Sequence, residues 1–162
     1  MTFHASSQAS APSESNVGAF ASDFRSTLIG RVFVARWFRV PREDSLEALL
    51  THIVAASKQR PGPLLYCAYL RSDAEVLDAK SRRLLAVFEP KILQHCEAIH
   101  IVFAGSGTVL KMLLTARRAV NILMAHRSSV FMHTSLNTFL DAAAEHLGGT
   151  KGAVAAQSIE ML

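Results

Sequence analysis

The segment that could most clearly bind a ligand consists of four small residues in which glycine and hydroxyl residues alternate: Gly105, Ser106, Gly107 and Thr108. They follow an apolar run and precede a helical pattern, and backbone N–H groups at the start of a helix bind phosphate well. A dinucleotide fingerprint would need a third glycine where Leu110 stands, and no hydroxyl residue follows Lys111 as a phosphate loop requires. The segment therefore predicts either an anion site or a tight turn that caps the next helix.

Residue types that could catalyse a reaction are scattered elsewhere. Asp73, Glu75 and Asp78 share one polar segment and could bind a cation or transfer protons, but no motif supports either role. The seven histidines are not expected to form a cluster, and no His-x-x-x-His, Cys-x-x-Cys or Gly-x-Ser-x-Gly spacing occurs. We therefore predict no catalytic residue, no metal site and no cofactor, and we rank an enzyme last.

The charge balance is mildly basic. Lys and Arg outnumber Asp and Glu by 17 to 13, which gives a formal net charge of +4. Such a surplus suits an acidic protein partner, an anionic membrane surface or nucleic acid, and it selects none of them. Basic residues recur in pairs, as at Arg36 and Arg39, but aromatic residues stand among them only at Trp37 and Phe38. This pattern argues against nucleic acid as the partner.

The two cysteines, Cys67 and Cys96, bear on the cellular compartment. Two cysteines in a domain of this size do not make a disulfide framework, so we expect both to be reduced, at least partly buried and cytoplasmic. No secretory signal is visible at the start of the chain. No run of about 18 uncharged apolar residues predicts a membrane span.

Short apolar runs alternate with amphipathic helical patterns along the chain. This alternation predicts a single α/β domain with a mixed sheet of about four to five strands, flanked by about four helices. Strands are expected at 31–40, 63–70, 98–105 and 129–133, and helices at 46–58, 81–95, 108–126 and 136–147. Residues 64–70 are apolar almost throughout, which is typical of a central strand covered on both faces.

Local signals set the expected boundaries. A hairpin should turn near Ile29–Gly30, Asp44 or Ser45 should cap the first helix, and Pro90 should kink or divide the second. Residues 1–22 are rich in Ser and Ala and predict a disordered tail. Residues 148–162 are expected to form a flexible tail after the paired glycines. The folded domain is then 24–147.

The order of a hairpin followed by repeated strand–helix units resembles the STAS family, the fold of anti-sigma-factor antagonists and sulphate-transporter tails. Two segments, Gly62–Tyr66 and Cys96–His100, are similar to those of small bacterial STAS-like proteins. The resemblance covers about residues 24–147 and implies a regulatory module without enzymatic activity. It also implies a phosphorylatable hydroxyl residue after the central strand, but Ala79 and Lys80 replace the usual hydroxyl residues there.

The first hypothesis for function is therefore docking of a signalling protein through the loop and helix start after the central strand. The residues predicted to bind the partner are Arg71, Ser72, Asp73, Asp78, Ser81 and Arg82. Ser72 or Ser81 is the candidate for phosphorylation, although Ser81 is more simply a helix cap. Two alternatives stay open. One is an anionic-ligand or nucleotide site at Gly105–Thr108, and the other is an oligomeric scaffold built on the apolar helix 108–126.

Overall fold

Residues 23–71, 77–104 and 129–162 are described by the computed structural model of the chain. Four of the sequence predictions lie outside these residues. They are the tail 1–22, the loop residues Ser72 and Asp73, the turn Gly105–Thr108 and the long helix 108–126.

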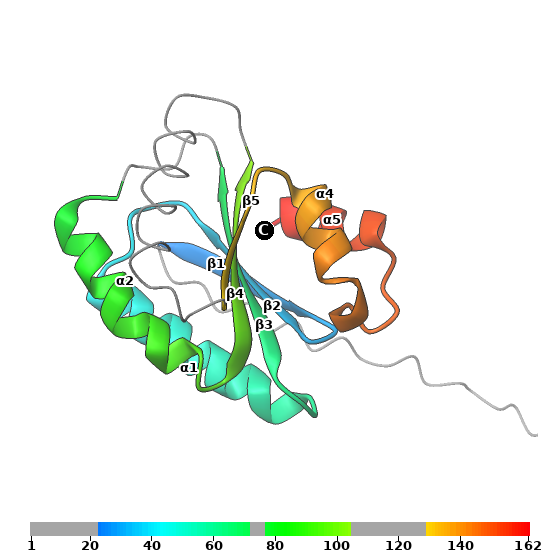
Figure 1. Cartoon of the computed structure of the whole chain (residues 1–162), viewed down its shortest axis with the longest axis horizontal. Coiled ribbons are helices and arrows are strands. Elements are labelled where there is room, and N and C mark those ends of the chain that lie inside the picture. The colour runs from blue at the N-terminus through cyan, green and yellow to red at the C-terminus, as the bar shows by residue number, and fades with distance from the viewer. Residues whose placement is uncertain (1–22, 72–76, 105–128) are drawn as a thin grey trace, which may run out of the picture.

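A mixed five-stranded sheet forms the centre of the domain, which confirms the predicted α/β class (Figure 1). The strands are β1 (Phe24–Ile29), β2 (Val32–Trp37), β3 (Leu64–Arg71), β4 (Cys96–Ala104) and β5 (Val130–His133). They lie in the sheet in the order in which they occur in the chain. The pair β1 and β2 is antiparallel, and β2 to β5 are parallel to one another. The carboxyl ends of these four strands therefore lie along one edge of the sheet.

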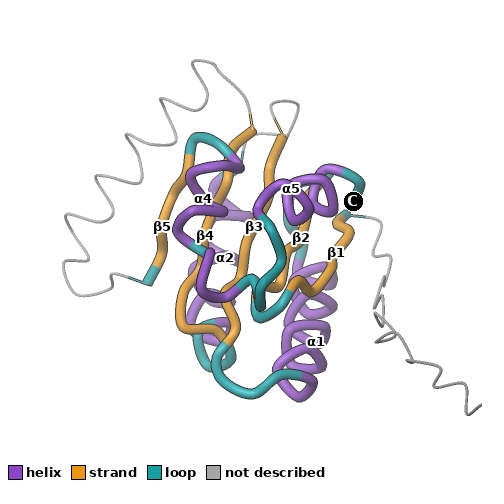
Figure 2. Tube along the Cα trace, turned by 90° about the vertical axis from the view of Figure 1, so that its right-hand side faces the viewer, coloured by secondary structure: helices purple, strands orange, loops and turns teal. Residues whose placement is uncertain are grey.

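Within the described residues, four helices cover the two faces of the sheet (Figures 1 and 2). Helices α1 (Glu43–Gln59) and α2 (Ala79–Ile92) lie on one face, and α4 (Leu136–Ala142) and α5 (Gly152–Glu160) lie on the other. A short 3₁₀ helix at Ala144–His146 separates α4 from α5. The predicted helix 136–147 is therefore two pieces.

The alternation of side chains along the strands divides the core into two layers. Phe33, Trp37 and Tyr66 pack toward α1 and α2, whereas Val34 and Cys67 pack toward α4 and α5. The first seven residues of β3 are buried or nearly so, which confirms that this apolar run is a central strand covered on both faces. Cys67 and Cys96 are buried and unbonded to each other.

Both large helices begin earlier than the sequence predicted. The N-cap of α1 is Arg42, and Ser45 acts from inside the first turn by accepting a hydrogen bond from the Arg42 backbone N–H. The N-cap of α2 is Asp78, whose carboxylate accepts from the Ser81 backbone N–H at 2.7 Å. Ser81 is therefore not the cap. Pro90 lies in the last turn of α2, so it does not divide the helix.

The segment 148–162 was expected to be a flexible tail, and that expectation is wrong. Gly148 and Gly149 have φ angles of 62° and 84°, which turn the chain back over the sheet. Residues Gly152–Glu160 then form α5, and Ala155 and Ile159, one turn apart, are fully buried against the sheet. These two apolar side chains form the buried face of α5, which was not predicted from the sequence.

The hairpin turn, predicted near Ile29–Gly30, is confirmed and is held against the loop after the 3₁₀ helix. Gly30 has a φ angle of 60°, and a Cβ atom placed on it would lie 2.5 Å from the carbonyl oxygen of His146. The same oxygen accepts a hydrogen bond from the Arg31 backbone N–H at 2.7 Å. Gly30 is thus required both for its backbone angle and for the close approach of two chain segments.

Substitution of Gly30 by Ala should lower the free energy of unfolding by roughly 2–4 kcal/mol, because backbone strain and a steric clash add together. Gly149→Ala is the matched control, since Gly149 also has a positive φ but has no atom within 4 Å of the added Cβ. It should cost about 1 kcal/mol. Urea denaturation measures both values, and equal losses for the two variants would show that the contact with His146 is unimportant.

Candidate functional site

The parallel register brings an exposed aromatic residue to the same edge of the sheet as the predicted site residue Arg71. Trp37 is aligned with Leu70 on β3, and Leu70 is aligned with Phe103 on β4. Phe38 follows Trp37 at the carboxyl end of β2, and Arg71 follows Leu70 at the carboxyl end of β3, so both lie at the carboxyl edge of the sheet. This edge is where open α/β sheets bind their ligands.

The ring of Phe38 contacts two arginine side chains. Its own side chain is 40% exposed, and the guanidinium carbons of Arg25 and Arg36 lie 5.6 and 5.1 Å from its ring centroid. Arg25 on β1 is aligned with Arg36 on β2, so both project from the face that carries α5. These distances are typical of cation–π contacts. We call Phe38, Arg25, Arg36 and Arg71 the carboxyl-edge surface.

A second aromatic residue, Tyr69, lies close enough to Arg36 and Arg71 for their charges to affect its pKa. Tyr69 on β3 is aligned with Arg36, and burial raises the pKa of its hydroxyl. The carboxylate of Glu160 adds to this increase, while the charges of Arg36 and Arg71 oppose it. One acidic and two basic side chains therefore act on the same group.

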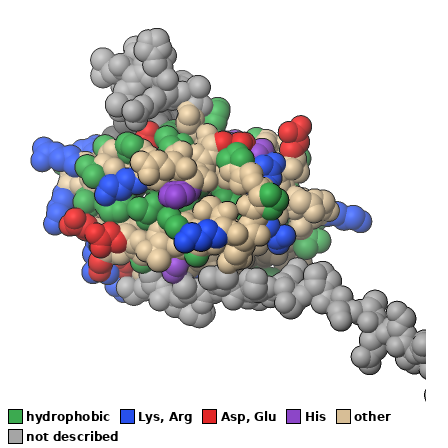
Figure 3. Space-filling view, turned by 90° about the horizontal axis from the view of Figure 1, so that it is seen from below, with side chains coloured by type: hydrophobic (Ala, Val, Ile, Leu, Met, Phe, Trp, Pro, Cys, Tyr) green, Lys and Arg blue, Asp and Glu red, His purple; other side chains and the backbone are tan. Residues whose placement is uncertain are grey.

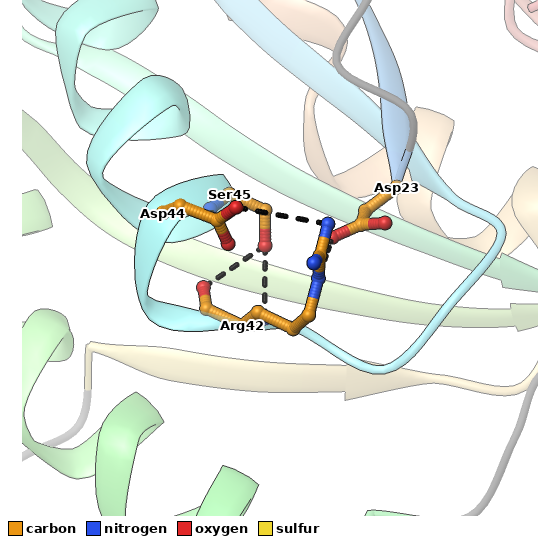
Figure 4. A network of polar contacts seen from close by, with 4 residues as sticks. All are labelled: Asp23, Arg42, Asp44 and Ser45. Atoms are coloured by element: carbon orange, nitrogen blue, oxygen red, sulfur yellow. Dashed lines mark hydrogen bonds and ion pairs between the residues drawn. The ribbon is translucent and has the colours of Figure 1, made fainter.

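The loop that carries Phe38 is fixed by Asp23. The carbonyl oxygen of Asp23 accepts hydrogen bonds from the backbone N–H groups of Phe38 and Arg39 at 2.9 and 3.4 Å. Its buried carboxylate accepts from Arg42 Nε at 2.8 Å (Figure 4). This contact raises the pKa of the Arg42 guanidinium, and Asp44 contributes to the increase. The network joins the start of β1 to the start of α1 and holds Phe38 at the edge.

The structure separates the residues that were predicted to bind a partner. Arg71 is exposed at the end of β3, while Asp78 and Arg82 are exposed on the first turn of α2. That turn lies on the opposite face of the sheet from α5 (Figure 1). Ser81 is only 5% exposed, so its hydroxyl contributes little to an open surface. The hydrogen bond from Ser81 lowers the pKa of Asp78, which agrees with the role of Asp78 as a cap.

Two histidines that the sequence treated as isolated are in direct contact. His100 Nδ1 and His133 Nε2 lie 2.8 Å apart, and the two rings are stacked. The expectation that the histidines do not cluster is therefore wrong. Its physical cause is the register of β4 and β5, which aligns Val102 with His133 and so places His100 and His133 diagonally on one face.

This histidine pair lies in an apolar setting with limited access to water. His100 is 6% exposed, and Phe139 of α4 packs against both rings. Nearby, His146 Nε2 lies 2.6 Å from a carboxylate oxygen of Glu97. The short contact between His100 and His133 requires one ring nitrogen to donate and the other to accept, so the pair cannot bind a proton on both facing nitrogens.

In the described part of the chain, no group of three or more His, Cys, Asp or Glu side chains is arranged to hold a metal ion. The potential nucleophile beside the pair is Cys67, which is aligned with His100 across β3 and β4. Burial raises the pKa of the Cys67 thiol far above its usual range, and this makes the thiolate scarce. The pair is therefore best understood as a packed, proton-sharing contact.

Comparisons with known proteins supply no identity. No protein-family model matches the chain, and neither a curated protein nor a solved structure matches it. Among the described helices, none is both long enough and apolar enough to span a bilayer. The function must therefore be argued from the geometry of the residues themselves.

The histidine pair predicts a loss of stability in mild acid. Burial lowers the pKa of His100 to about 4, with smaller contributions from His133 and His146. In the unfolded chain His100 binds a proton near pH 6.5, whereas in the folded chain it binds one only near pH 4. The contribution of neutral His100 to the free energy of unfolding is therefore fully present above pH 6.5. It is lost as the pH falls from 6.5 to 4, which lowers the free energy of unfolding by about 2–3 kcal/mol.

His100→Gln keeps a hydrogen-bonding group but removes the titration, so its free energy of unfolding should depend less on pH between 7 and 4. His95→Gln, in the turn before β4, is the control and should retain the wild-type dependence. Urea denaturation across this pH range gives the slopes. A wild-type slope in His100→Gln would contradict the prediction.

Proposed function

We propose that this chain is a non-enzymatic protein-interaction module of STAS-like type, which docks a signalling partner at the carboxyl edge of its sheet. The observation that carries the proposal is Phe38, an exposed aromatic ring in contact with Arg25 and Arg36 at the edge of the sheet where Arg71 ends β3. Arginine and aromatic side chains contribute most of the binding energy in many protein interfaces. Arg71, one of the residues that the sequence had already indicated, belongs to this surface.

The charges at this edge favour an acidic partner segment. Arg39 and Arg71, which follow β2 and end β3, are both exposed there. The net charge of +4 has the same sign. The opposite end of the molecule, seen in Figure 3, carries its Lys and Arg side chains scattered rather than gathered. Complementary charge would speed association and select among partners.

The family and compartment form part of the same proposal. The STAS-like assignment is supported by the hairpin and the strand–helix alternation that first indicated it. A binding role is favoured over an enzymatic one because Cys67, the cysteine aligned with His100, is buried, and burial raises the pKa of its thiol. Two unbonded, buried cysteines suit the reducing cytoplasm.

Charge reversal at the edge should abolish capture of the partner. We expect Arg71→Glu and Phe38→Ala to reduce recovery of one stoichiometric protein at least about ten-fold in affinity purification from the native cell. Quantitative mass spectrometry measures the recovery. Asp78 is left unchanged because its substitution would remove the cap of α2.

Arg60→Glu is the matched control for charge, because Arg60 is exposed at the end of α1, where β3 begins. It should capture the partner as the wild type does. Thermal denaturation should show that all three variants are folded. Equal recovery by the wild type and both edge variants would refute docking at this surface.

A further inference from the structure

The last residues of α5 already occupy part of the carboxyl-edge surface. Arg36 Nη1 donates a hydrogen bond to the carbonyl oxygen of Glu160 at 2.9 Å, and Arg25 Nη1 donates to the backbone oxygen of Leu162 at 3.0 Å. These oxygens lie at the negative end of the helix dipole. The Glu160 carboxylate adds a full negative charge close to Tyr69. The two arginines thus donate to oxygen acceptors, as they would to the carboxylates of an acidic ligand.

The bonding of Arg36 is incomplete even with α5 in place. Its Nε atom is buried and has no hydrogen-bond partner among the described residues. A buried donor without an acceptor is unfavourable, and an acceptor better placed than the Glu160 carbonyl would remove that cost. A carboxylate that engages Nε and one Nη in parallel has the required geometry.

Helix α5 is attached to the domain by few side chains. Only Ala155 and Ile159 are buried along its nine residues, whereas Val154 is 52% exposed and Met161, just after the helix, is 70% exposed. The preceding turn contains Gly148 and Gly149, which give the chain unusual freedom. An element with so few buried contacts opens more easily than the sheet beneath it.

We propose that the end of α5 is an internal ligand of the carboxyl-edge surface, and that an acidic segment of the partner binds Arg25 and Arg36 by displacing it. This inference rests on the proposed function and adds a regulation of the same site. Binding then requires release of α5, so the apparent affinity for the partner is the intrinsic affinity multiplied by the fraction of molecules in which α5 is released. Any change that releases α5 should strengthen binding.

A hexaglutamate peptide carrying a fluorescent label serves as the probe, and the full-length chain is titrated into it at low ionic strength. Ile159→Ser removes the main buried anchor of α5 without altering the carboxyl-edge surface. Val154→Ser is the matched control, because it makes the same kind of change at an exposed position of the same helix. Fluorescence anisotropy gives the dissociation constants.

The expected result is that Ile159→Ser binds the peptide at least about five-fold more tightly than the wild type, while Val154→Ser binds as the wild type does. Addition of Arg71→Glu should weaken binding in both backgrounds. Near-ultraviolet circular dichroism checks the fold, and Ile159→Ala replaces the serine variant if the latter is unfolded.

Two other results overturn the inference in different ways. Binding that is lost with Arg71→Glu but equal in the wild type and Ile159→Ser would keep the docking surface and exclude displacement of α5. Absence of binding in every folded form would mean that the surface does not accept acidic segments, and the proposed function would fail with it.

Discussion

The alignment of β3 between β2 and β4 is the constraint on which the rest of the structure depends. Backbone hydrogen bonds on both sides of β3 place Trp37, Leu70 and Phe103 in one row, so the residues that follow them meet at one edge. A shift of one residue would also reverse the faces of every side chain on the strand. The apolar side chains of β3 prevent such a shift, because both faces are packed. The site is thus a consequence of the core.

The two faces of the sheet contribute different contacts to the carboxyl-edge surface. On the α1 and α2 face, Trp37 Nε1 donates a hydrogen bond to the Tyr66 hydroxyl at 3.0 Å inside the core, which fixes the end of β2 just before Phe38. On the other face, α5 brings its carbonyl oxygens to Arg25 and Arg36. One face is therefore a rigid support, while the other contains a small helix that is held by two buried apolar side chains and by the hydrogen bonds of Arg25 and Arg36. A surface that the core fixes in position and that the end of α5 partly covers is suited to regulated binding.

Features encoded by neighbouring residues could be predicted from the sequence. The hairpin turn at Gly30, the buried run of β3 and the alternation of strands and helices all follow from local patterns. Features that depend on pairing between strands could not. The contact of His100 with His133 needs the register of β4 and β5, and the presence of Phe38 and Arg71 at one edge needs that of β2 and β3. Helix α5 was missed because its buried stripe consists of only two residues, Ala155 and Ile159.

The central claim is that a partner protein contacts the carboxyl edge at Phe38. The most direct test replaces Phe38 by a photoreactive phenylalanine analogue in the native cell and identifies the proteins cross-linked on illumination. The same analogue at Val87, which is 58% exposed on α2, is the control. The account predicts one dominant cross-linked protein from position 38 and none from position 87. Cross-linking of that protein from position 87 alone would contradict it.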